Sequence, residues 1–169
     1  MPIVNTDIIF RLSGGAGNTD VNASLGGAKS STAITTNVVD NFFDSVSGTE
    51  SAAGDTEYRC FYFHNAHATL TAQNSKVYIT SNTTSTGDTL DIGIGSAAIN
   101  GTEQTVANES TAPTSVSFSA PTSYATGIAL GNIPAGQHIA VWVRRIVDAA
   151  AGAKDNNVAT LEIGVDTAE

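Results

Sequence analysis

The 169-residue chain has one cysteine and four prolines, and charged residues supply only 14% of it. Because Cys60 is alone, no internal disulfide can form and stability must come from packing. We expect Cys60 to be a small buried strand residue, since a nucleophilic role needs a base and a lowered pKa. No run of 18 apolar residues occurs, so no membrane span is expected. The first residues lack the basic and apolar regions of a secretory signal.

Basic residues are also scarce, because sixteen acids face seven bases and give a net charge of −9. An acidic surface repels phosphate backbones, which excludes general nucleic-acid binding as an expected function. Thr, Ser, Asn and Gly are abundant, with 67 residues between them, yet 41% of the chain is hydrophobic. That content is enough to build a core, so the composition is typical of a turn-rich β protein rather than a disordered one.

The stretch from Asp55 to His64 predicts a central strand. Its large residues alternate between two faces, with Tyr58, Cys60 and Tyr62 on one and Arg59, Phe61 and Phe63 on the other. Aromatic and β-branched residues favour such a pleated environment. A second run of this kind covers residues 138–147.

Shorter alternating runs predict the remaining strands, at residues 7–12, 76–80, 89–95, 116–118, 127–130 and 158–165. Turn residues separate them at the spacing of a sandwich or barrel. The expected fold is therefore all-β: an antiparallel β-sandwich, jelly-roll-like, with about eight strands and almost no helix beyond one turn near residues 39–43. The residues expected in its core are Tyr58, Tyr62, Val77, Ile92, Val141 and Leu161.

We expect residues 1–39 to form an N-terminal strand followed by a long polar segment, and residues 40–169 to form the sandwich body. Both parts are expected to belong to one domain. A loop as long as residues 13–39 is uncommon in a compact domain. It is either an arm that becomes ordered on a partner or a meandering loop with short edge strands.

No set of residues predicts catalysis, a cofactor or a metal. His64 and His67 have a spacing that does not place both rings on one face of a strand. Asp88 and Asp91 lack the oxygen pattern of a calcium loop. The glycine pairs near residues 14–17 and 26–27 lack the lysine of a phosphate loop, and no nucleophile elbow occurs. We expect no enzyme.

Candidate interface residues come from two places. Ile3, Val4 and Ile8 belong to the N-terminal tail and first strand, which could reach a neighbour. Trp142 and Arg144 share one strand face, and this pair of residue types is enriched at interface hot spots. Trp142 as a core residue and Arg144 or Arg145 as the partner of Glu57 or Glu162 are the alternative interpretations.

The order of these motifs resembles that of head-decoration (cement) proteins of tailed bacteriophages. The motifs are Gly54–Asn65, Lys76–Ile79, Leu130–Gly136 and Ala140–Arg145. The resemblance implies a sandwich or jelly-roll module, often trimeric, that is made in the host cytoplasm and binds the major capsid protein on the capsid surface of the virion. It implies no catalytic, cofactor or metal residue.

The alternative interpretation is a carbohydrate- or receptor-binding sandwich of a phage tail or fibre. Such modules display exposed Trp and Tyr side chains, and this chain has one Trp. A tail-tube or baseplate component is a third interpretation, because a fold does not set a function.

Overall fold

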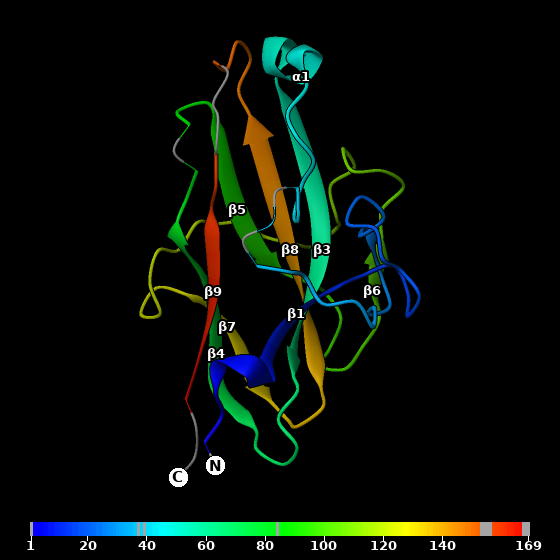
Figure 1. Cartoon of the computed structure of the whole chain (residues 1–169), viewed down its shortest axis with the longest axis vertical. Helices are drawn as coiled ribbons and strands as arrows, with labels where there is room; N and C mark the ends of the chain where they lie inside the picture. The colour runs from blue at the N-terminus through cyan, green and yellow to red at the C-terminus, as the bar shows by residue number, and fades with distance from the viewer. Residues whose placement is uncertain (1, 37, 39, 84, 153–156, 167–169) are drawn as a thin grey trace.

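The computed structural model describes residues 2–36, 38, 40–83, 85–152 and 157–166. Nearly all regular structure in this part of the chain is β (Figure 1), which confirms the all-β, helix-poor prediction. The nine strands are β1 (Ile8–Leu12), β2 (Gly26–Gly27), β3 (Asp55–Asn65), β4 (Ala72–Ser81), β5 (Asp88–Ile94), β6 (Glu103–Thr105), β7 (Ile128–Ile133), β8 (His138–Val147) and β9 (Thr160–Asp166). Two short helices complete the fold, the 3-10 helix η1 (Asn5–Asp7) and α1 (Gly48–Ala53).

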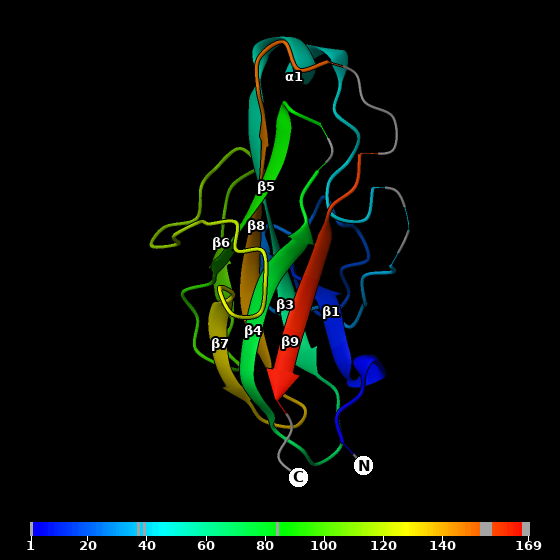
Figure 2. The same ribbon diagram turned by 90° about the vertical axis from the view of Figure 1, so that its left-hand side faces the viewer.

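All strand pairs are antiparallel, and they form three layers. Sheet A has the strand order β1-β3-β8-β5, and sheet C has the order β7-β4-β9. The short pair β2-β6 lies on the other side of sheet A from sheet C. The arrangement is sandwich-like, with β3 and β8 at the centre of sheet A (Figure 2).

Both faces of β3 are buried, as its alternating pattern predicts. Phe61 and Phe63 lie in the large core between sheets A and C. Tyr58, Cys60 and Tyr62 lie in a second core under the β2-β6 pair. The thiol of Cys60 is fully buried, and burial raises its pKa well above the usual value. This environment is that of a packing residue.

Five of the six predicted core residues are buried, namely Tyr58, Tyr62, Val77, Ile92 and Val141. The sixth prediction is only partly right. Leu161 packs against the large core but is only partly buried. It belongs to β9, an edge strand of sheet C, and an edge strand has a neighbour on one side only.

Two predictions of regular structure are wrong. Residues 116–118 form no strand, because Val116 and Phe118 pack into the second core from a loop. Of the expected helical turn near residues 39–43, Val39 lies outside the described residues and residues 40–43 form turns and bends. The helix forms instead at α1, where Ser47 and Glu50 make a reciprocal capping box.

The long polar segment after β1 is a meandering loop with one short strand, the second of the two alternatives above. It folds back over sheet A, and the side chains of Ser13, Ser24 and Ser30 are fully buried. Gly26 is required where β2 meets β6, because a Cβ there would lie 1.8 Å from the carbonyl oxygen of Gln104 and φ is +98°. The buried serine side chains indicate that hydrogen bonds replace part of the apolar packing in this segment.

Candidate partner interface

The N-terminal segment comprises the described residues between 2 and 41. β1 and the described residues after 31 face the viewer in Figure 1, whereas the stretch around β2 lies at the right, beside β6; β1 lies at the right in Figure 2. β1 forms one edge of sheet A, and β9 forms one edge of sheet C. The segment therefore covers an open side of the sandwich, where any partner that docks on this side must contact it.

The three N-terminal residues predicted at an interface differ in exposure. Ile3 and Ile8 are partly buried and pack against the large core. Val4 lies between them and is 52% exposed. Its backbone N–H donates to the carboxylate of Asp7 at 2.9 Å, which fixes the turn at η1. Val4 is thus an apolar side chain held outward on an ordered turn.

An open groove of about 320 Å³ lies within the same segment. Its walls come from residues 19–21, 32–35, 38, 40 and 41, and Leu12 of β1 lines it as well. The lining mixes threonine and acidic side chains with apolar ones, among them Val38, which is 50% exposed. The lining is thus about as mixed as ordinary protein surface, and its composition by itself favours no class of ligand.

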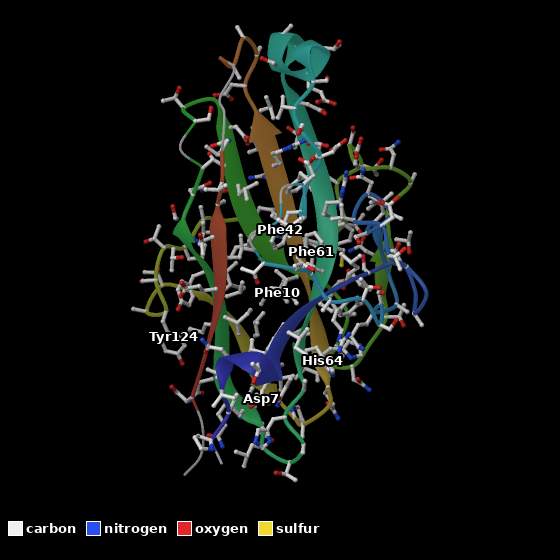
Figure 3. All side chains as sticks on the ribbon, in the orientation of Figure 1. Asp7, Phe10, Phe42, Phe61, His64 and Tyr124 are labelled. Atoms are coloured by element: carbon white, nitrogen blue, oxygen red, sulfur yellow. The ribbon has the colours of Figure 1, made fainter. Side chains whose placement is uncertain are left out.

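Aromatic rings fix the loop that ends at this groove (Figure 3). The ring of Phe42 lies edge-on to Phe61 of β3, with centroids 4.6 Å apart, and to Phe10 of β1, with centroids 6.5 Å apart. Such pairs stabilise by about 0.5–1.5 kcal/mol beyond their buried area. The outer wall of the groove is therefore tied to two strands of sheet A.

A buried charge cluster fixes the next residues of the same loop. It comprises the guanidinium groups of Arg59 and Arg145 and the carboxylates of Glu57, Asp44 and Glu109. The two guanidinium groups also lie over the ring of Phe43, at 5.5 and 4.9 Å from its centroid. Arg145 donates to the carbonyl oxygen of Asp44 at 2.6 Å. The cluster thus joins residues 43–44 to β3 and β8.

This cluster is also the group of carboxylates best placed for a metal in the described part of the chain. Oxygens of Asp44, Glu57 and Glu109 lie within 4.8 Å of one another. Both guanidinium groups already occupy the space between them. A metal cation would have to displace an arginine side chain. The three carboxylates and two guanidinium groups are therefore better explained as an internal ion-pair network than as a metal site.

The two strand residues predicted at an interface lie elsewhere. Trp142 is fully buried in the second core, so its prediction as a surface anchor is wrong and its core interpretation holds. Arg144 has a side chain that is 28% exposed, forms an ion pair with Asp91, and lies 4.9 Å from the centroid of Phe118. Its neighbour Arg145 pairs with Glu57, one of the two partners that the sequence suggested.

The polar residues considered for metal or catalysis do not converge. His64 Nδ1 accepts a hydrogen bond from Arg11, and His67 Nδ1 accepts from the backbone of Thr69 and Leu70. Asp91 binds Arg144, whereas Asp88 accepts from Asn157. Each group has a separate structural partner.

Sequence reasoning missed the groove and most of the charge cluster. Asp20 and Asp40 are isolated acids in a polar stretch, and nothing in their spacing shows that the chain brings them to one groove. The pairing of Glu57 with Arg145 could be found, because both lie on predicted strands. The contribution of Asp44 depends on a loop that no periodicity describes.

No protein-family model, curated protein or solved structure matches this chain. Within the described residues, no helix has both the length and the apolar character needed to span a membrane.

Proposed function

We propose that this protein is a structural component of a phage particle that binds the major capsid protein on the outside of the shell and stabilises it. The support is the order of motifs described above together with a rigid, all-β body. The proposal includes a homo-oligomer, with a trimer as the expected form.

The observation that carries the proposal is the partly apolar surface of the described residues between 2 and 41. Two of the four large apolar side chains that are exposed in the described chain, Val4 and Val38, belong to this segment. Val4 lies on a turn fixed by its hydrogen bond to Asp7, so little conformational entropy is lost when a partner covers it. An interface that is ordered in advance suits a protein that must bind many equivalent sites on a shell.

Binding of this kind stabilises the shell by mass action. A protein that binds only the mature shell stabilises it by RT ln(1 + [L]/Kd), about 2.7 kcal/mol per site at a hundredfold excess over Kd. Particles that lack the protein should therefore release their DNA at a lower temperature than complete particles. Equal thermal release, with the protein located on the tail by electron microscopy, would contradict the proposal.

The contact surface can be tested with single substitutions. Removing residues 1–30 is unsuitable, since that deletion also removes β1, which places Phe10 and Leu12 in the large core. Val4→Glu introduces a charge on the proposed surface instead. We expect particle binding to weaken at least tenfold, because burial of a valine contributes about 1.5–3 kcal/mol and a buried charge costs more.

Val158→Glu is the matched control. Val158 is 63% exposed and precedes β9, outside the N-terminal segment. Particle binding by this variant should equal that of the wild type. Equal loss in both variants would show that the effect is not specific to the proposed surface.

A second candidate function, carbohydrate binding, is favoured by one feature of sheet C. Tyr78 and Tyr124 lie half-buried on its outer face, and Tyr124 appears at the side of the body in Figure 3. The ring of Tyr124 lies against Gly164 of β9, where a Cβ would be 2.4 Å from it. The Nζ of Lys76 is 4.9 Å from the same ring. A glycan array with wild type and Tyr124→Ala separates the two functions.

A further inference from the structure

The cations of this acidic chain that lack a carboxylate partner are unevenly distributed. Arg59, Arg144 and Arg145 form ion pairs. Among the other described cations, Lys76 lies over a tyrosine ring. Arg11 and Lys29 remain: Arg11 donates to His64, and the charge of Lys29 acts on both His64 and His138. In a chain with seven basic residues and a net charge of −9, this concentration requires an explanation.

Strand register brings three of these four groups together. His64 of β3 is directly opposite His138 of β8, and Arg11 of β1 is opposite Tyr62 of β3. The alternation of strand faces places Arg11, His64 and His138 on the side of sheet A that carries Tyr62. Figure 3 shows His64 near the end of β3, beside β1.

Direct contacts hold the group in place. Arg11 Nε donates to His64 Nδ1 at 3.0 Å, so the proton of neutral His64 is on the other ring nitrogen. The ring of His138 is edge-on to that of Tyr62, with centroids 5.0 Å apart. The hydroxyl of Tyr62 donates to the carbonyl oxygen of Gly27, just before Lys29 in the loop after β2.

No carboxylate compensates these charges. Among the described residues, no carboxylate oxygen lies within 4.0 Å of a nitrogen of the four side chains. The carboxylate of Asp7 turns back to Val4, and that of Glu103 accepts from Ser96 and Ala97. His138 Nδ1 is buried and has no hydrogen-bond partner.

The four groups also affect one another electrostatically. Burial and the charge of Arg11 lower the pKa of Lys29. Burial and the charges of Lys29 and Arg11 lower the pKa of His64. Burial, Lys29 and His64 lower the pKa of His138 to about 4. Burial and neighbouring positive charge thus disfavour the charged forms of Lys29, His64 and His138, and a bound anion would favour them.

We propose that Arg11, Lys29, His64 and His138 form a binding site for a small tetrahedral oxyanion, of the sulfate or phosphate class. A guanidinium group with free N–H donors and an ammonium group are the pair of side chains that most often bind such anions. Arg11 Nε donates to His64 and Nη1 donates to the carbonyl oxygen of Ser31, so these contacts position the guanidinium group. Its Nη2 and the ammonium group of Lys29 bind the oxygens, and the bound anion makes His138 easier to protonate at acidic pH. This proposal does not depend on the proposed function.

Histidine side-chain NMR on the full chain tests the proposal. Sulfate is the first probe because it stays doubly charged across the titration range of His138, and inorganic phosphate is the second. At constant ionic strength set with chloride, sulfate should give saturable shifts at His64 and His138 and leave His67 unchanged. It should also raise the pKa of His138 by at least about one unit.

Lys29→Gln is the test variant, and Lys76→Gln is its matched control on sheet C. Lys29→Gln should weaken sulfate binding at least tenfold. Without sulfate it should also raise the pKa of His138, because a repelling charge is removed; a purely structural role of Lys29 would not do so. Lys76→Gln should behave as wild type. Linear, non-saturating shifts that are equal in wild type, Lys29→Gln and Lys76→Gln would overturn the proposal.

Discussion

Among single substitutions in this protein, Glu57→Gln should cause one of the largest losses of stability. Glu57 is 1% exposed, and Arg145 pairs with it directly while Arg59 lies 4.0 Å from its other oxygen. Removal of its charge leaves two guanidinium groups whose side chains are 0% and 8% exposed. Breaking a buried ion pair from one side costs about 3–5 kcal/mol.

The remaining carboxylates offset part of that cost. Asp44 and Glu109 still face the arginines, but their side chains are 52% and 41% exposed and are therefore screened by water. We expect a loss of about 3 kcal/mol in the free energy of unfolding. For a chain of this size, that loss corresponds to a decrease in Tm of about 6–12 °C.

Urea denaturation followed by the fluorescence of Trp142 measures this loss, since Trp142 is the single tryptophan and is fully buried. The exposed Glu162 provides the control, and Glu162→Gln should change stability by less than about 1 kcal/mol. The double variant Glu57→Met with Arg145→Met should be more stable than Glu57→Met alone, because it leaves fewer unpaired charges. A loss below about 1 kcal/mol for Glu57→Gln would refute the reasoning.

Three further predictions concern single residues. Cys60 should react slowly with thiol reagents in the native state and rapidly in urea, because its thiol is fully buried; rapid native labelling would contradict this. Gly26→Ala should cost about 2–5 kcal/mol, since φ is +98° and the methyl group would clash with Gln104; Gly17→Ala, where a Cβ meets nothing within 4 Å, is the control for the same urea measurement. His138 has a pKa lowered from 6.5 to about 4, so the stability that its neutral form contributes is present above pH 6.5 and is lost as pH falls toward 4. The difference in unfolding free energy between wild type and His138→Gln should shrink over that range, and a constant difference would exclude the shift.

The sequence predicts the centre of this fold well because the two long strands carry strong patterns. The alternation of Tyr58, Cys60 and Tyr62 with Phe61 and Phe63 correctly indicates two buried faces. The pattern cannot show what covers each face. For Trp142 the sequence favours a core position and leaves a surface position open; in the structure Leu25, Val116 and Phe118 cover the core in which it lies.

Errors in the prediction have identifiable physical causes. The four-residue spacing near residues 39–43 suggests a helical turn. Instead, the ring of Phe42 packs against Phe61 of β3, and the guanidinium group of Arg145 lies over the ring of Phe43. The true helix carries a local signal, Ser47 followed three residues later by Glu50, which outweighs the apolar spacing. The short strands β2 and β6 have no periodicity and depend on the close backbone approach at Gly26.

The candidate interface could be predicted only in part. Val4 is at the surface as expected, whereas Ile3 and Ile8 are partly used by the core. The groove and the cationic site each combine residues from separate segments, and such combinations depend on strand register. In the cationic site, Arg11, His64 and His138 come from three different strands.

The pairing of β3 with β8 has a consequence for how the protein is made. Residue 64 pairs with residue 138, and residue 55 pairs with residue 147, so the central ladder cannot close until most of the chain has left the ribosome. During that interval β3, whose residues 57–63 are all buried in the folded protein, is synthesised but lacks this partner. A ladder of such long sequence separation folds slowly. Assembly of this protein into any larger particle must therefore follow the synthesis of β8, and until then the unpaired strand is exposed to aggregation.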